Sequence, residues 1–414
     1  MIWSEILLIL LLAFTWRVPA VSYKPNDDAH GVRMSFNNDF TVTAFNDEYK
    51  YHIRFLSANQ DLQCIIPYQN CDLYVYSLSV MPMEKNHKTF SFVQISENQT
   101  SNYAILSLVT FTLAHCNSSS PLTVSDKIVW KNGHQESMML KVDPQEKYAY
   151  VFADSFILSY DLSTQEIQQE NITFYGASKT IIITAFDLTN EWAFMIGYTP
   201  STRVDFSYSH FYTVNLLSRK LSQCDDSNVT FLSHISAQSI YRRDQSASVS
   251  INPSGNLLAV GVSIINQVQI FETSRIIQCS FKSIGNIRPA SHLNTVGIGF
   301  GRSVAWLSDQ GPLAVLVYNP KNQMVPESEI HVFKMKSQNN EILHAPPDFI
   351  FPNNQQTLPK NWKRKSFLLI LARSNNLLIL ADSHRYLYIP SADPGSRSVL
   401  SNEGYVECFN LLDE

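Results

Sequence analysis

One serine stands in a setting that approaches a hydrolase motif. The segment Gly301-Arg302-Ser303-Val304-Ala305 is close to G-x-S-x-G, in which a sharp turn between a strand and a helix exposes a nucleophilic serine. Here Ser303 leads into another strand-like run, and the following residues do not indicate a helix. The sequence therefore favours a serine within a strand, and it assigns no catalytic residue.

Histidines and acids offer the remaining acid–base chemistry. The candidate ligands or bases lie outside any HxH or HExxH grouping; they are His115, His292, His331 and His384. Glycosidases need only two facing carboxylates, and the candidates for such a pair are Glu136, Asp143, Asp154 and Asp161. Spacing along the chain does not indicate a facing pair, so we predict no cofactor and no metal, and an enzyme stays the alternative.

A basic cluster is the third candidate. Four Lys and Arg residues surround Trp362 within Lys360–Lys365. Such a cluster can bind a sulfated glycan or an anionic surface, with the tryptophan stacking on a sugar. Charge runs usually serve solubility, so a solvated loop between structural elements is the favoured interpretation.

The composition describes a chain with a large apolar core and a weak electrostatic field. The 414 residues are 45% hydrophobic and 12% aromatic, and only 16% are charged, against about 25% in average globular proteins. The net charge is -5. A field this weak gives no electrostatic support to a nucleic-acid partner, so that class of function is excluded.

The first 20 residues are predicted to be a secretory signal peptide. An apolar run spans Ile6–Phe14, and the small-residue pattern Val18-Pro19-Ala20 follows it. A bilayer span needs about 20 apolar residues, and this run meets Arg17 too early. The best later candidate, Phe367–Leu380, is interrupted by polar residues and is better read as two strands and a turn. Apart from the signal peptide, we predict no transmembrane segment.

Sequons for N-glycosylation agree with export. Four Asn-x-Ser/Thr patterns occur, at Asn98, Asn117, Asn171 and Asn228. We therefore predict a secreted glycoprotein, or one on the extracellular side of the cell surface.

Six cysteines, an even number, favour disulfides in an exported chain. Cys64 and Cys71 are close enough in sequence for a turn to bring them together, since a disulfide needs Cα atoms about 4.4 to 6.8 Å apart. Cys224 and Cys279 flank the Ser248–Thr273 segment and are predicted to staple it. Cys408 pairs with Cys116 if the chain is complete; if it begins a cysteine-rich continuation, one cysteine stays unpaired.

The elements that must position these residues are strands. Aromatic and β-branched runs bounded by Asn, Asp, Ser or Pro follow one another, as in Tyr49–Leu56 and Leu73–Val80. One modest helical candidate, Asn132–Leu140, can equally be a loop. The clearest unit is Ser248–Thr273, which predicts three strands, with Asn252-Pro253-Ser254-Gly255 as the first turn.

The phrase "INPSGNLLAVG…VQIFE" in this unit resembles blades of YVTN- and WD-type β-propellers. Similar units recur with turn anchors about 58 residues apart; they span Met139–Ile167, Ile181–Leu221, Ile298–Met335 and Phe367–Ile389. The fold class we predict is all-β, a single β-propeller of about seven four-stranded blades, with six as the alternative.

The segment "GFGRSVAWLSDQGPLAVLVYNP" is also similar to the FG-GAP repeat of integrin α-type propellers. Phe300-Gly301 and the closing Val317–Pro320 match that framework. The calcium loop of that repeat spaces several oxygen ligands before a glycine. Here Asp309 and Gly311 have no further acid beside them, so the resemblance implies the propeller class without its calcium site.

These predictions divide the chain into a signal peptide at 1–20, a polar lead at 21–35, a propeller at 36–392 and a tail at 393–414. The tail begins with Asp393-Pro394-Gly395 and resembles a linker to a further module. The predicted function is non-catalytic recognition or adhesion, with an extracellular protein or glycan as the partner. The alternative is an extracellular propeller hydrolase with an active site in its funnel.

Overall fold

The structure is a computed structural model of the whole chain. It describes residues 30–36, 40–47, 50–57, 63–68, 73–81, 89–98, 103–112, 123–131, 138–153, 156–171, 182–199, 206–217, 220–221, 232–236, 248–262, 266–280, 282–289, 299–309, 312–317, 329–334, 347–351, 366–373, 376–382 and 404–410.

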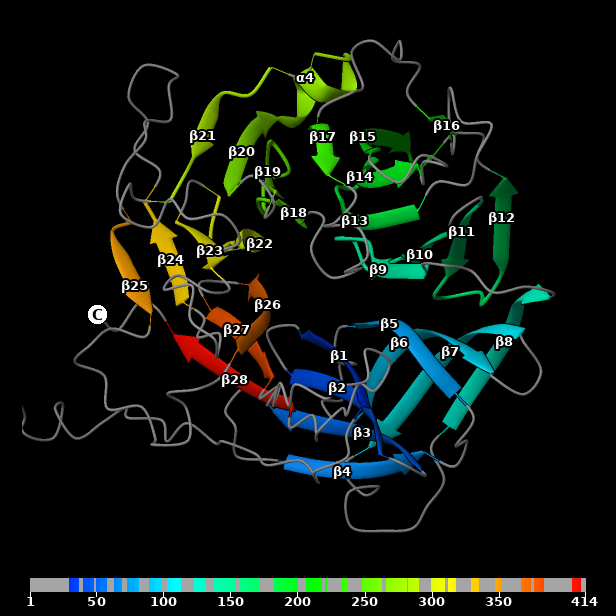
Figure 1. Cartoon of the computed structure of the whole chain (residues 1–414). Helices are drawn as coiled ribbons and strands as arrows, with labels where there is room; N and C mark the ends of the chain where they lie inside the picture. The colour runs from blue at the N-terminus through cyan, green and yellow to red at the C-terminus, as the bar shows by residue number, and fades with distance from the viewer. Residues whose placement is uncertain are drawn as a thin grey trace, which may run out of the picture.

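The described strands form seven antiparallel sheets, each built from strands that follow one another along the chain, and Figure 1 shows these sheets around a common centre. We number them blades 1 to 7. Blades 1 to 3 comprise β1 (His30–Phe36), β2 (Phe40–Asp47), β3 (Lys50–Ser57) and β4 (Gln63–Tyr68); β5 (Leu73–Val80), β6 (Thr89–Asn98), β7 (Tyr103–Thr112) and β8 (Thr123–Lys131); and β9 (Met138–Val142), β10 (Tyr148–Ala153), β11 (Phe156–Asp161) and β12 (Ile167–Asn171).

Blades 4 and 5 comprise β13 (Ile182–Leu188), β14 (Trp192–Thr199), β15 (Phe206–Asn215) and β16 (Lys220–Leu221), with β17 (Leu232–Ser236) also paired to β15; and β18 (Ser248–Ile251), β19 (Leu257–Val262), β20 (Gln267–Glu272) and β21 (Gly285–Ile287). Blades 6 and 7 comprise β22 (Phe300–Trp306), β23 (Leu313–Val317), β24 (Glu329–Phe333) and β25 (Phe349–Phe351); and β26 (Ser366–Arg373), β27 (Asn376–Asp382) and β28 (Gly404–Asn410). This arrangement is the predicted all-β propeller.

Local sequence explains how a blade forms, as blade 5 illustrates. Asn252 follows β18, and its side-chain oxygen accepts a hydrogen bond from the Leu257 amide at 2.9 Å. The turn then passes through Gly255 at φ +75°, a left-handed conformation that glycine adopts without steric cost. Beyond the turn, β19 carries the apolar run Leu258–Val262, which is buried. The Asn-Pro-Ser-Gly pattern therefore sets where the hairpin turns, as predicted.

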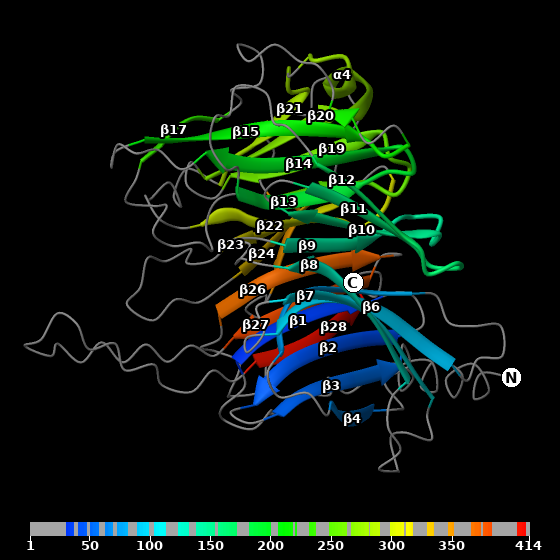
Figure 2. The same ribbon diagram turned by 90° about the vertical axis from the view of Figure 1, so that its right-hand side faces the viewer.

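The first strand of each blade is the inner one. β1, β5, β9, β13, β18, β22 and β26 contact one another in that order, so the inner strands lie side by side around the centre. Figure 2 shows the blades from the side, with their strands stacked through the height of the molecule.

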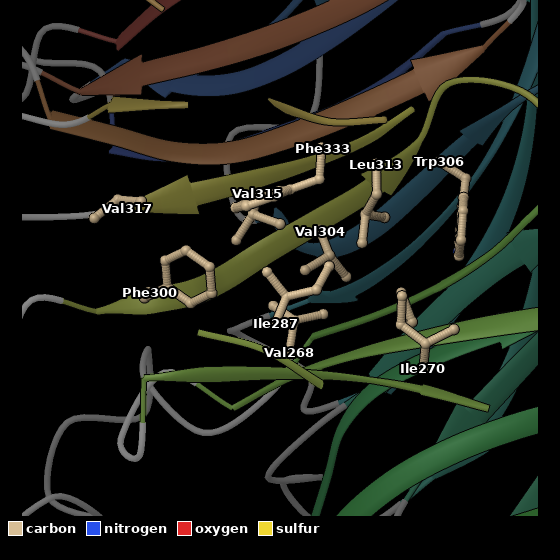
Figure 3. Close-up of a cluster of buried hydrophobic side chains, with 11 residues drawn as sticks. Val268, Ile270, Ile287, Phe300, Val304, Trp306, Leu313, Val315, Val317 and Phe333 are labelled. Atoms are coloured by element: carbon tan, nitrogen blue, oxygen red, sulfur yellow. The ribbon is translucent and has the colours of Figure 1, made fainter. Parts of the chain in front are cut away.

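Apolar side chains between neighbouring blades make the core, and the contact between blades 5 and 6 shows the pattern. Figure 3 shows Ile270 and Ile287 of blade 5 facing Val304 and Phe300 of blade 6. Phe300 and Ile270 are completely buried. Burial of this kind contributes about 25 cal/mol for each Å² of apolar surface removed from water, so facing sheets hold the ring together.

The boundaries of the propeller differ from the predicted ones at both ends. β1 begins at His30, within the predicted polar lead, and β28 occupies residues 404–410 of the predicted linker tail. β28 pairs with β27 in register, and Cys408 lies opposite Leu378. The turn-forming residues 393–395 predicted a linker at this point, but they give no information about a strand that begins nine residues later. The segment 404–410 is therefore part of blade 7.

One short helix, α4 (Thr273–Ile277), connects β20 to β21. The helical candidate Asn132–Leu140 runs partly into β9, which begins at Met138, and the rest of it lies outside the described residues. Over the described part of the chain, none of the helices combines the length and the apolar character that a membrane span requires.

Tyr160 supplies a test of the packing between blades 2 and 3. Its side chain is 1% exposed, and within the described structure its hydroxyl has no hydrogen-bond partner. Replacement of Tyr160 by Phe removes a buried polar group that contributes no bond, so we expect the free energy of unfolding to rise by about 1 kcal/mol. Urea unfolding measures the change, and Tyr148→Phe, at a half-exposed ring, serves as the control with little effect.

The same residue predicts an alkaline effect. Burial raises the pKa of Tyr160 above its ordinary value of 10.0. The unfolded chain therefore loses the phenolic proton first, and stability that is fully present below pH 10.0 decreases as the pH rises through the folded-state pKa. Unfolding curves recorded on both sides of pH 10.0 should show a smaller alkaline loss for Tyr160→Phe than for the wild type. Equal losses would contradict this assignment.

Candidate functional site

The two sides of the ring are formed by different parts of the chain: the inner strands begin on one side and end on the other. Near the ends of the inner strands, Val142 of β9 donates its amide hydrogen to Ser79 Oγ of β5 at 3.2 Å, and Trp306 of β22 donates Nε1–H to the Ser250 carbonyl of β18 at 3.0 Å. The inner strands thus end at the same level. We call this side the turn rim, formed by residues 143–147, 161–166, 189–191, 216–217, 252–256 and 307–309. The side where the inner strands begin is the entry rim.

Asp187 links three blades near the turn rim. Its Oδ1 forms an ion pair with Lys141 Nζ of blade 3 and accepts the Leu188 amide of its own blade at 2.8 Å. Its Oδ2 accepts the Ile251 amide of blade 5 at 2.7 Å. The Asp187 side chain is 9% exposed and that of Lys141 is 45% exposed. Both carboxylate oxygens are thus engaged by fixed donors, which suits Asp187 to hold blades together.

The turn that follows β18 reaches the next blade. Asn252 is 1% exposed, and its Nδ2 lies 2.7 Å from the Asp309 carbonyl oxygen of blade 6. Within its own turn, the same nitrogen lies 2.9 Å from Ser254 Oγ and 2.7 Å from Asn256 Oδ1. Thr273 closes the outer side by donating to the Gly255 carbonyl at 2.8 Å. The turn is therefore held from both sides, and its backbone has a defined position.

Asp143 and Asp161, two of the predicted candidate carboxylates, also hold turns. Asp143 Oδ1 accepts the amides of Lys147 and Tyr148 at 2.8 and 3.0 Å. Asp161 Oδ1 accepts hydrogen bonds from the Ser163 hydroxyl and the Thr164 amide. These bonds hold the pKa of Asp161 below its usual value, and the bond from the Ser163 side chain has the largest effect. These acids shape the rim.

The side chains that the turn rim presents to solvent are mostly polar and mixed in charge, and Leu217, which is 82% exposed, is an apolar exception. Lys147 and Glu191 are exposed, as are several neutral residues of the same turns, among them Gln145, Asn190, Ser254 and Asn256. A backbone fixed by hydrogen bonds, with exposed donors and acceptors on it, can bind a partner without a large loss of conformational entropy. The turn rim is therefore the candidate interaction surface.

Two predicted chemical candidates lie inside blade 6. Ser303 lies within β22, which continues to Trp306 and is followed by a turn and by β23, so the strand–helix setting of a nucleophile elbow does not occur here. His331 of β24 is completely buried, and its Nε2 lies 3.1 Å from Glu329 Oε2. Phe300 and Phe333 flank its ring. Both residues are buried within blade 6.

Several other candidates lie outside the described residues: His115, His292, His384, Glu136, Asp154 and the basic cluster Lys360–Lys365. Within the described residues, no group of three or more His, Cys, Asp or Glu side chains is placed to hold a metal ion. Asp309, which occupies the position of the FG-GAP calcium loop, contributes its carbonyl to the Asn252 contact instead.

Cys279 lies just beyond α4 with φ +61° and is disulfide-bonded. Its amide donates to the Ile276 carbonyl, and the Ser280 amide donates to the Arg275 carbonyl, a pattern that ends a helix with a left-handed residue. The predicted pairing with Cys224 lies outside the described residues, as do Cys71 and Cys116. The strands β4 and β28 contain Cys64 and Cys408 respectively. Of the sequons, Asn98 ends β6 and Asn171 ends β12, whereas Asn117 and Asn228 lie outside the described residues.

Known structures resemble most of the chain. The β-propeller domain of Cps50 (Swd1) from Myceliophteria thermophila is 10% identical, with 94% of this chain and 99% of that one covered and a TM-score of 0.51. The propeller domain of the Trilobed protease from Pyrococcus furiosus (8% identical, 93% of each chain, TM-score 0.48) and Hsv2 from Kluyvelomyces marxianus (10%, 87% and 92%, TM-score 0.44) are more distant.

No protein-family model matches the sequence, and no curated protein is similar to it. The YVTN and FG-GAP resemblances of single segments therefore hold only at the level of the propeller fold, and no family of that kind matches the chain. At this identity, the likeness to the Cps50 domain shows the fold alone. A β-propeller of this kind is a scaffold suited to protein interaction.

Proposed function

We propose that the chain is an exported β-propeller that recognises a protein or a glycan through its turn rim and does not catalyse a reaction. The observation that carries this proposal is the chain of contacts Lys141–Asp187–Ile251 and Asn252–Asp309, which joins the turns of four successive blades. Such contacts fix the rim before a partner arrives. The preorganised surface then loses little entropy on binding.

The assignment of roles to the acids also supports recognition. Asp143, Asp161 and Asp187 each accept hydrogen bonds from backbone amides, so their carboxylate oxygens already have partners within the fold. A hydrolase with an active site in the funnel needs acids or histidines that exchange protons with a substrate. These three acids therefore have a structural role.

Export is supported by the predicted signal peptide, by the four sequons and by the disulfide at Cys279. Disulfides persist mainly in oxidising compartments, such as the secretory pathway and the cell surface. We therefore propose that the protein acts in the extracellular space or on the outer side of the cell surface.

A binding screen tests the proposed surface. The purified full chain is presented to arrays of purified ectodomains and of glycans, and any ligand is then titrated against Lys147→Glu and Glu191→Lys, two charge reversals at exposed positions of the turn rim. We expect each to weaken binding about tenfold or more, as central interface contacts do. Gln169→Lys, at an exposed position of the outer strand β12, is the matched control and should bind like the wild type. Turnover of an arrayed substrate, or equal affinity of all variants, would contradict the proposal.

A further inference from the structure

Apolar surface reaches the solvent at one part of the turn rim. Within the described residues, the large apolar side chains that are exposed are those of Tyr148, at 37%, and Leu217, at 82%. Tyr148 begins β10 directly after the turn 143–147, and Leu217 lies two residues beyond the end of β15. A single exposed apolar side chain is common on proteins. Here, however, both side chains border the same seam of the ring, the one between blades 3 and 4.

Both residues continue one buried cluster to the rim. Tyr150 of blade 3 and Leu216 of blade 4 belong to the apolar cluster between these two blades. The Tyr148 ring lies beside that of Tyr150, with the ring centroids 6.1 Å apart, and Leu217 follows Leu216 in the chain. The Leu216 amide donates to the Glu191 carbonyl at 2.8 Å, which fixes the backbone next to Leu217. The seam therefore carries apolar side chains from the core to the solvent.

The corresponding turn of blade 5 shows that folding does not require an exposed ring at this position. In both blades the residue after the inner strand accepts amides through its side chain, Asp143 from Lys147 and Tyr148, and Asn252 from Leu257. Tyr148 of blade 3 thus corresponds to Leu257 of blade 5, which packs against the core between blades 5 and 6. The same turn forms with its apolar side chain turned inward, so the exposure of Tyr148 is particular to blade 3.

The turn of blade 3 is also more restricted than that of blade 5. The left-handed position is occupied by Gly255 at φ +75° in blade 5 and by Glu146 at φ +60° in blade 3. Glycine adopts this conformation without steric cost, whereas a residue with a Cβ loses stability there. The same Cβ limits the other conformations open to the turn. A restricted turn loses less conformational entropy when a partner binds.

The charges beside the seam do not favour a ligand of one sign. Lys147 is exposed on the turn after β9, and Glu166 and Glu191 are exposed on neighbouring turns. The ammonium of Lys141 is already paired with Asp187. Because charges of both signs lie close together, they give a strongly anionic or cationic ligand little long-range attraction. Burial of apolar surface is then the main gain that a ligand can make here.

We propose that the seam between blades 3 and 4 at the turn rim binds a protein partner, one of whose uncharged apolar side chains packs on Tyr148 and Leu217. This inference rests on the proposed recognition function and narrows its partner from a protein or a glycan to a protein. The Leu217 side chain offers a sugar neither a hydrogen bond nor an aromatic face. Contact with an apolar side chain, by contrast, removes the exposed surface of both from water.

Selection from a displayed library of random peptides tests this surface with a defined probe. The purified full chain is the bait, and the enriched peptides are synthesised and titrated against matched variants. Leu217→Ser and Tyr148→Ser remove apolar surface, whereas Leu217→Met and Tyr148→Phe keep it. We expect the enriched peptides to share an uncharged apolar residue and to bind each Ser variant about tenfold or more weakly. The Met and Phe variants should bind them like the wild type, as should Ser274→Ala, at an exposed position of α4 in blade 5.

Urea unfolding separates lost binding from lost folding. Leu217 is 82% exposed, so Leu217→Ser should unfold at the same urea concentration as the wild type while its peptide affinity falls. Peptides that bind the Ser variants and the wild type equally overturn the inference. Peptides that share only a charged residue, or a library from which no peptide is enriched, overturn it as well.

The arrays of ectodomains and glycans distinguish failure of this inference from failure of the proposed function. An arrayed glycan whose binding is weakened by Lys147→Glu, and not by Leu217→Ser, overturns the inference and leaves recognition through the turn rim standing. An arrayed ectodomain with that same pattern does so too. Turnover of an arrayed substrate contradicts the proposed function itself, and the peptide titrations still report on the seam between blades 3 and 4.

Discussion

Replacement of Gly261 by alanine is expected to disrupt the contact between blades 5 and 6 and to lower the free energy of unfolding. A Cβ at this position would lie 2.1 Å from the Gly301 carbonyl oxygen and 2.5 Å from Ser248 Oγ, far inside any real contact. The nearest obstacle is backbone, so relief requires movement of a strand in the neighbouring blade. Forced overpacking costs about 1 to 3 kcal/mol, and a clash with fixed backbone belongs at or above the upper end of that range.

Urea denaturation of Gly261→Ala measures this cost, and two variants locate its origin. Addition of Ser248→Ala removes the side-chain obstacle but leaves the Gly301 carbonyl, so the double variant should stay as unstable as Gly261→Ala. Gly255→Ala, whose new Cβ would lie 3.2 Å from the end of the Thr189 side chain, should cost only the 1 to 2 kcal/mol or so of a left-handed alanine. If Gly261→Ala is no more damaging than Gly255→Ala, the close approach of the two blades is wrong.

The close approach also explains the Phe-Gly pair that resembled an FG-GAP repeat. Phe300 is completely buried between blades 5 and 6, and Gly301 has φ +84° at a register shift between β22 and β23. Its carbonyl accepts a hydrogen bond from Ser248 Oγ at 2.9 Å. The pair therefore serves packing between blades, which gives the motif a structural reason that is independent of calcium.

The structural features that could be predicted from the sequence are those that depend on residues close together in the chain. Alternating apolar residues and the Asn252-Pro253-Ser254-Gly255 turn predicted a hairpin that the structure forms between Ile251 and Leu257. α4 was not predicted, because five residues are too few to show a helical period. β28 was missed because turn-forming residues precede it and no long apolar run marks it.

The candidate site depends on contacts between blades, which local patterns do not encode. Asp187 lies near the end of β13, yet its partner Lys141 lies 46 residues earlier, in another blade. The packing of β9 beside β13 brings the two together. The same holds for Asn252 and Asp309, which are 57 residues apart. A set of Asp or Asn residues at the ends of successive inner strands was the available signal, and it indicated turns without indicating their partners.

Removal of the Asp187 carboxylate should be the most costly change at the turn rim. Asp187→Ala leaves the amides of Ile251 and Leu188 without their acceptor in a region where Asp187 itself is 7% exposed. Each buried donor that loses its partner costs about 1 to 3 kcal/mol, so we expect a loss of about 2 to 5 kcal/mol in the free energy of unfolding. Asp187→Asn keeps one oxygen and should fall between Asp187→Ala and the wild type.

Lys141→Ala is the matched variant for the other side of the ion pair. The Lys141 side chain is 45% exposed, so water replaces the carboxylate as its partner, and the expected loss is below about 1 kcal/mol. Hydrogen exchange should add a local signature: in Asp187→Ala the Ile251 amide exchanges faster, because its acceptor at 2.7 Å has gone, while in Lys141→Ala it stays protected. Equal losses in the two variants, or an unchanged Ile251 amide in Asp187→Ala, would mean that the blades are joined by apolar packing alone and that the turn rim owes its shape to each hairpin separately.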